Sequence, residues 1–100
     1  MKTIKYIQKR EGIVEPFDKK KIVDAIEKAF TKSNEGNRFI ANQTTESVVE
    51  TLLRAYSNQI PTVEQVQDIV EDTLISYNFK HAAKEYIRYR YERNKQRVMV

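Results

Sequence analysis

The chain lacks cysteine and tryptophan, and its 100 residues include only two glycines, two prolines and one histidine. Without cysteine it can form no disulfide framework, zinc ribbon or thiol-based active site, which is typical of proteins from a reducing cytosol. Two glycines are too few for a glycine-rich phosphate loop of the hydrolytic type. The lone His81 has no second histidine or cysteine near it, so we expect no metal site.

Long apolar runs are also missing. No uncharged stretch approaches the ~20 residues that a membrane helix needs, and Met1 to Lys5 are not followed by the apolar segment of a secretion signal. We therefore expect a cytoplasmic protein without membrane contact. A chain of 100 residues fits one domain with a limited core, so a surface cleft is a better expectation than a deep enclosed active site.

Charge and hydrophobic content point to a folded, basic domain. Hydrophobic residues make up 40% and charged residues 32% of the chain, which is typical of a globular protein. The net charge is +4 and the sequence pI is about 9.3. An excess of cations suggests an anionic partner, and nucleic acid, nucleoside phosphates and acidic protein surfaces all qualify.

The first part of the chain predicts a β-hairpin. Residues alternate from Thr3 to Gln8, with β-branched and aromatic side chains in the first half, which indicates a strand. Gly12 provides a turn, and the extended pattern resumes at Ile13 and continues to Pro16. The sequence therefore predicts two short strands joined by a glycine turn.

Four helices are predicted after the hairpin. Asp18 is the expected N-cap of a helix from Lys19 to about Lys32, and a loop follows at residues 33–37. The other three helices are expected from about Thr45 to Asn58, from a capping box at Thr62 and Gln65, and from about Lys80 after a break at 77–79. The last should turn one face inward with Ala82, Ala83, Tyr86, Ile87 and Arg90. The expected fold class is α+β, mostly α, with an N-terminal β-hairpin covering a four-helix bundle.

Several charged residues gather where the hairpin meets the first helix. Lys9 and Arg10 precede the glycine turn, and both side chains are suited to phosphate, arginine through its planar fork and lysine through a compact charge. Glu15, Asp18 and Lys21 lie around the start of the first helix, whose N-terminus attracts anions. Taken singly, each has an ordinary structural role as a surface charge or a helix cap. Their joint spacing is more informative.

That spacing resembles the ATP-cone family. The segment from Ile7 to Ile22 is similar to the family's opening signature, Val-x-Lys-Arg-Asp-Gly followed by Phe-Asp and then Lys-Ile, with Ile7 and Glu11 as conservative departures. Residues 61–71 resemble the family's third-helix segment, and residues 82–90 resemble its final helix. We therefore expect an ATP-cone domain at residues 1–95, with residues 96–100 beginning a linker to a further part of the protein.

The resemblance implies a site in which ATP and dATP compete. It implies phosphate contacts from Lys9 and Arg10, adenine contacts from Glu15 and Asp18, and a phosphate or ribose contact from Lys21. Gln67 stands where some relatives place a phosphate-binding histidine, and a cation of the final helix completes the set, with Arg90 preferred over Arg88 and Arg93. The full expected site is Ile7, Lys9, Arg10, Glu15, Phe17, Asp18, Lys21, Ile22, Val63, Gln67, Arg88 and Arg90.

The function implied by the resemblance is allosteric control of a ribonucleotide reductase. Such a domain reads ATP or dATP, with Mg²⁺ expected beside the triphosphate, and changes the oligomeric state of the reductase without catalysing a reaction itself. Two alternatives remain open at this point. The tyrosines and cations interleaved at residues 86–97 could form a basic helical nucleic-acid-binding module, although tyrosines at this spacing are more often the edge of a helical bundle. A protein-docking domain with a decayed nucleotide site is the other, and Lys9, Arg10 and Lys21 argue against decay.

Overall fold

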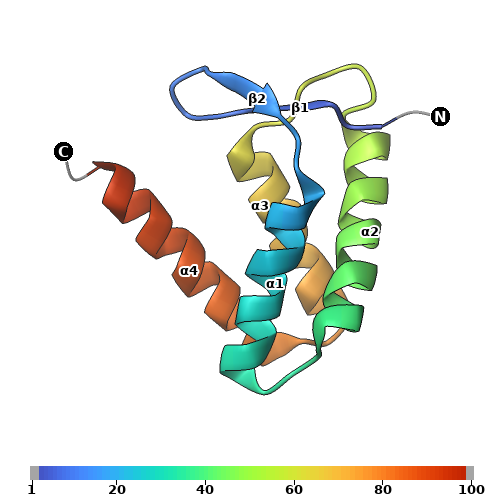
Figure 1. The fold of residues 1–100 in the computed structure, drawn as a ribbon, viewed down its shortest axis with the longest axis vertical. Coiled ribbons are helices and arrows are strands. Elements are labelled where there is room, and N and C mark those ends of the chain that lie inside the picture. Colours follow the sequence, from blue (N-terminus) through green and yellow to red (C-terminus); the bar gives the residue numbers. More distant parts are fainter. Residues whose placement is uncertain (1–2, 99–100) are drawn as a thin grey trace.

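A two-stranded hairpin precedes four helices in the computed structural model, which describes the backbone of residues 3–98 and the side chains of residues 3–93 (Figure 1). The elements are β1 Tyr6–Gln8, β2 Val14–Pro16, α1 Lys19–Ser33, α2 Arg38–Ala55, α3 Val63–Ser76 and α4 Lys80–Val98. The expected fold class is confirmed. None of the helices in the described part is long and apolar enough to cross a membrane. The expected linker is residues 96–100. Its side chains lie outside the described part of the chain, and so does the backbone of residues 99–100.

The hairpin is antiparallel and short. Its register pairs Tyr6 with Pro16 and Gln8 with Val14, and Gly12 closes the turn at φ 82°, a conformation that glycine adopts without steric cost. A backbone hydrogen bond from Gln8 N to Pro61 O, at 3.0 Å, ties β1 to the segment before α3. The hairpin therefore lies across one end of the bundle, over the starts of α1 and α3 (Figure 1).

The helices form a ring in which α1 contacts α2, α2 contacts α3, α3 contacts α4 and α4 contacts α1. Their inward faces supply the core, whose largest fully buried apolar side chains include Phe30, Ile26, Leu52, Leu74, Val48 and Val70. The ring of Phe30 meets that of Phe79 edge-on at 4.9 Å between centroids. Toward the hairpin, α4 diverges from α1, so the bundle opens at that end (Figure 1).

Helix α2 begins at Arg38, and the prediction that it begins near Thr45 is wrong. Asn37 is its N-cap, because its side chain accepts a hydrogen bond from Ile40 N at 2.9 Å. The two threonines at the predicted start lie in the helix interior, fully buried, where each hydroxyl donates to the carbonyl four residues earlier. The polar run at residues 42–45 hid the helical pattern, and the helix ends at Ala55, before the predicted Asn58.

The other boundaries follow the predicted caps. Asp18 is extended at φ −124° and accepts from Lys20 N, and Thr62 forms the predicted capping box with Gln65. Asn78, at φ 65°, interrupts the helical conformation between α3 and α4 as expected. Within α4, Ile87 is 45% exposed, so its predicted place on the inner face is wrong. The inner face is a narrow stripe because, within the described residues, α4 packs mainly against α1 and α3.

Candidate functional site

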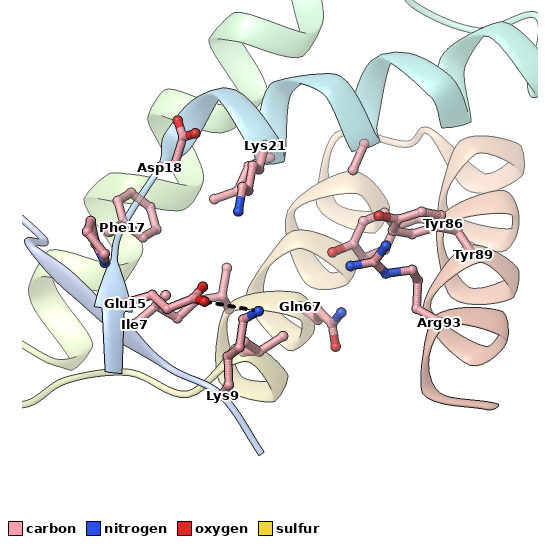
Figure 2. A pocket seen from close by; sticks show the side chains of 15 residues that line it. Ile7, Lys9, Glu15, Phe17, Asp18, Lys21, Gln67, Tyr86, Tyr89 and Arg93 are labelled. Carbon is pink, nitrogen blue, oxygen red and sulfur yellow. Dashed lines mark ion pairs between the residues drawn. The ribbon is translucent and has the colours of Figure 1, made fainter. Parts of the chain in front are cut away.

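A cleft opens between the hairpin, the starts of α1 and α3, and the far half of α4 (Figure 2). The empty space of the cleft, with its open mouth included, is about 920 Å³. The residues that line it are Ile7, Lys9, Glu15, Pro16, Phe17, Asp18, Lys21, Ile22, Ala25, Val63, Val66, Gln67, Tyr86, Tyr89 and Arg93. Every one of these comes from an element at the open end of the bundle.

Three cations reach the cleft from three different elements. Lys9 comes from the end of the hairpin strand, Lys21 from the first turn of α1 and Arg93 from α4, and all three line the cavity (Figure 2). Two carboxylates share the lining, and that of Glu15 lies 3.2 Å from the Lys9 ammonium. Asp18 accepts from the first turn of α1 as its cap. The cations outnumber the carboxylates, so the cleft is suited to an anion.

An apolar wall lies beside these charges in the cleft. Ile7 and Phe17 from the hairpin and Ile22 from α1 are partly buried against the core, and Val63 and Val66 continue the wall on α3. Strand alternation explains why these hairpin side chains lie on the cleft side. Residues two apart face the same side of a strand, and Ile7 pairs with Glu15. A wall of this kind is suited to the face of a flat, uncharged ring.

Gln67 contributes an unusual polar atom. It lies on α3, one turn after Val63, and its Oε1 is buried without a hydrogen-bond partner among the described residues. Buried polar atoms nearly always have a partner, so an acceptor left without one needs an explanation. In the cleft, a bound molecule with a hydroxyl or amino group can supply the missing donor.

Helix α4 closes the cleft with two tyrosines and Arg93. The rings of Tyr86 and Tyr89 pack at 6.0 Å between centroids. Burial is the main cause that raises the pKa of Tyr86 far above its usual value, so this phenol stays neutral at physiological pH. The spacing of Tyr86, Tyr89 and Arg93 places them on the inner face of the helix, continuing the stripe from Ala82.

Nine of the residues expected from sequence line the cleft, and Arg10, Arg88 and Arg90 do not. Arg10 Nε donates to Glu64 Oε1 at 2.8 Å, and this bond is the main cause that lowers the pKa of Glu64. Arg88 is bound to Glu85 within α4, with 67% of its side chain exposed. Arg90 is turned toward α3. Their expected contacts with phosphate remain predictions.

Pro16, Ala25, Val66, Tyr86 and Tyr89 line the cleft but were not expected in the site. Arg93 was considered in the sequence and ranked behind Arg90. The inner-face spacing of α4, counted from the buried Ala82, would have favoured Arg93, but it could not be separated from that of Arg90 without knowing which neighbour each faces.

Comparison with known proteins identifies the family. The family described as ATP cone domain matches residues 5–95. The vitamin B12-dependent ribonucleoside-diphosphate reductase of Thermoplasma acidophilum is 40% identical over 95 residues, which cover 90% of this chain and 12% of that protein. The ribonucleoside-diphosphate reductase subunit alpha of Chlamydia pneumoniae is 36% identical, with 91% of this chain and 10% of that protein covered. The chain belongs to the ATP-cone family and is a nucleotide-sensing regulatory domain.

The relatives are far longer than this chain. The anaerobic ribonucleoside-triphosphate reductase of Haemophilus influenzae is 32% identical over 86% of this chain, and the match covers 12% of its own length. The chain thus spans about a tenth of the curated relatives that it matches. It corresponds to a domain of these proteins and is not a reductase by itself.

Proposed function

We propose that ATP and dATP bind in the cleft and that the difference between them controls the overall activity of a ribonucleotide reductase. The observation that carries the proposal is the convergence of Lys9, Lys21 and Arg93 on a cleft that apolar side chains also line. Phosphates match the cations, and a purine ring matches the wall. Membership of the ATP-cone family and the reductase relatives support the same proposal.

The phosphates and the adenine base each have matching groups in the cleft. Lys9, Lys21 and Arg93 bind the phosphates, and Arg10 joins them only by leaving Glu64. The carboxylates of Glu15 and Asp18 accept hydrogen bonds from the adenine amino group. Around these groups, the ring packs against the apolar side chains of Ile7, Phe17, Ile22 and Val63.

Magnesium enters the proposal with the triphosphate. The described residues include no group of three or more His, Cys, Asp and Glu side chains that could hold a metal ion. Mg²⁺ at nucleotide sites typically keeps several waters and is held by phosphate oxygens with one or two carboxylates. In this cleft the ion therefore binds chiefly to the nucleotide's own phosphates.

Regulation requires unequal binding. A ligand with the same affinity for two assembly states shifts neither, so the 2'-hydroxyl that separates ATP from dATP must change the relative stability of those states. We propose, as the family resemblance implies, that ATP supports activity and that dATP favours a homo-oligomer in which the reductase is inactive. The reductase subunits are the partners in this scheme.

The test is calorimetric titration of the chain with ATP, dATP and GTP in the presence of Mg²⁺, with light scattering to follow its mass. We expect saturable, adenine-selective binding and an increase in mass with dATP. A Lys9→Gln/Lys21→Gln variant should lose at least about tenfold in ATP affinity, because hydrogen bonds to charged groups contribute about 1.5–3 kcal/mol each. A Lys28→Gln/Lys32→Gln variant removes the same charge from exposed positions of α1 outside the cleft and should bind normally. No binding at millimolar nucleotide contradicts the proposal.

The nucleic-acid alternative has little support from the last helix. It depended on tyrosines that could stack on bases, but Tyr86 is 4% exposed and Tyr89 packs against the core. Only Tyr91, at 67% exposure, presents its ring to solvent among these three. Titration with an oligonucleotide at physiological salt checks this reading, since binding that falls steeply with salt is the mark of phosphate contacts.

A further inference from the structure

Arg90 binds α3 behind the cleft. Its Nη1 lies 2.8 Å from Asp68 Oδ1 and 2.9 Å from Glu71 Oε1, and its Nη2 donates to the carbonyl oxygen of Glu64 at 3.3 Å. Only 18% of the side chain is exposed. Residues 64, 68 and 71 lie on successive turns of one face of α3, so a single guanidinium spans two turns of that helix.

Glu64 also forms a hydrogen bond with a second arginine, Arg10, through its side chain. While its carbonyl accepts from Arg90, its carboxylate accepts from Arg10 at 2.8 Å. Arg10 belongs to the hairpin turn, Arg90 to α4, and Glu64 to the first turn of α3. These three elements are walls of the cleft, so the pair of bonds joins them at one residue.

The contacts of Arg90 with α3 hold the C-terminal half of α4 in place. Among the described side chains, Arg90 is the last along α4 that forms a hydrogen bond or ion pair with another helix. Toward its C-terminal end α4 diverges from α1 (Figure 1). Tyr89 and Arg93, which line the cleft, lie one residue before and three residues after it. A change in the tilt of α4 at Arg90 therefore changes the positions of both in the cleft.

We infer that Arg90 is a positioning residue that holds α4 against α3, so that Tyr89 and Arg93 complete the nucleotide site, and that Arg90 does not itself bind the nucleotide. The inference rests on the proposed function. It assigns the phosphate contact of the last helix to Arg93. To serve as a phosphate ligand, Arg90 would have to leave two carboxylates and a carbonyl on the outer side of the cleft.

The two roles predict opposite effects of removing the carboxylates. In an Asp68→Asn/Glu71→Gln variant, a phosphate-binding Arg90 is released from competing anions, and ATP affinity rises. A positioning Arg90 loses its anchor, α4 shifts, and ATP affinity falls by about fivefold, in line with about 1 kcal/mol for the lost contacts. Calorimetry near physiological ionic strength, where the field of distant charges is screened, measures the sign. A rise overturns the inference.

Matched variants separate position from net charge and from folding. Glu50→Gln/Asp72→Asn removes the same charge from exposed positions outside the cleft and should leave ATP affinity unchanged. Arg90→Gln should weaken ATP binding, and Arg90→Lys should restore part of it, because lysine keeps one ion pair but not the fork. In an Arg93→Gln background, Arg90→Gln should have a smaller effect than in the unmodified chain, because only the position of Tyr89 is left to lose. Full additivity of the two losses contradicts an action through Arg93.

A readout without nucleotide tests the inference even if the proposed function fails. Amide hydrogen exchange of the free chain should be faster in residues 86–93 of Arg90→Gln than in the unmodified chain, with α1 and α2 unchanged. Unchanged exchange in α4 contradicts the positioning role. Failure of the unmodified chain to bind ATP, with faster exchange in α4, contradicts the proposed function alone.

Discussion

Lys9 and Glu15 face one another on the cleft wall, with 3.2 Å between the Lys9 ammonium and a carboxylate oxygen of Glu15. The hairpin register produces this pair, because Ile7 lies opposite Glu15 and Lys9 follows Ile7 by two residues on the same strand face. About a third of each side chain is exposed, and ion pairs of this kind contribute only about 0–1 kcal/mol. A polyphosphate can therefore replace Glu15 as the partner of Lys9 at little cost.

Replacing Glu15 tests its proposed role as the acceptor for adenine. A carboxylate only accepts hydrogen bonds, so it favours the amino group of adenine and repels the carbonyl oxygen of guanine. In Glu15→Gln the amide can donate, and the ratio of ATP to GTP affinity should fall by about tenfold, equivalent to about 1.4 kcal/mol. Calorimetric titration with both nucleotides measures the ratio.

The control for this prediction is Glu11→Gln. Glu11 is exposed in the hairpin turn and does not line the cleft, so the same loss of charge there should leave the ratio unchanged. An unchanged ratio in Glu15→Gln would mean that the carboxylate does not read the base.

A substitution at Gly36 tests how tightly the loop before α2 packs against Phe30 in the core. Its φ is +58°, and a Cβ there would lie 2.6 Å from Cδ2 of Phe30, a side chain that is only 2% exposed. Gly36→Ala should lower the free energy of unfolding by about 2–4 kcal/mol, from left-handed backbone strain and overpacking together. Gly12→Ala is the matched control, because φ is +82° but the nearest atom is 3.9 Å away. It should lose only about 1–2 kcal/mol.

Denaturant unfolding of the two alanine variants gives both values. Equal losses would show that Phe30 can move aside and that strain alone sets the cost.

The cleft illustrates what the sequence could predict. The hairpin, the Asp18 cap and the Thr62 capping box are local features, each encoded within a few neighbouring residues, and the structure has all of them. These local features determine the positions of most cleft residues that come from the hairpin and α1. The start of α2 was missed because its cap, Asn37, lies in a stretch of turn-forming residues and because four polar residues, 42–45, follow the apolar residues of its first turn.

The arginines were harder to predict because their partners are distant in sequence. Arg10 bonds to a residue 54 positions away and Arg90 to one 19 positions away. Helical spacing puts Arg90 near the inner face, but only the packing of α4 against α3 determines that Asp68 and Glu71 bind it. Such long-range pairing is not visible in the periodicity of a single sequence.

Replacing Gln67 should stabilise the free chain but weaken the stabilisation that ATP provides. A buried acceptor without a partner costs about 1–3 kcal/mol, so an apolar residue of similar length should stabilise the free chain by about 1 kcal/mol. In Gln67→Met the thermal midpoint without nucleotide should rise, whereas the further rise caused by ATP should shrink, because the ligand loses its acceptor. Gln43→Met, on an exposed part of α2, should change neither quantity. A larger rise with ATP in Gln67→Met would mean that Gln67 does not contact the nucleotide.

The pair of Arg10 and Glu64 should make stability depend on pH. The hydrogen bond from Arg10 is the main cause that holds the pKa of Glu64 below its usual 4.5. Because the folded-state pKa is the lower one, the unfolded chain binds the proton first as pH falls, so the pair's contribution is complete above pH 4.5 and lost as pH falls through the folded pKa. With about a third of the Glu64 side chain exposed, that contribution is below about 1 kcal/mol.

Urea unfolding of the unmodified chain and of Glu64→Gln, from neutral pH down to acid, measures this dependence. The difference in the free energy of unfolding should be constant at neutral pH and should shrink once pH falls below 4.5, the usual carboxyl value. Arg10→Gln should show the same loss, because it removes the other partner, and about 1 M salt should reduce the difference by screening. A difference that persists unchanged into acid would mean that packing of the Glu64 side chain, and not its charge, connects the hairpin to α3.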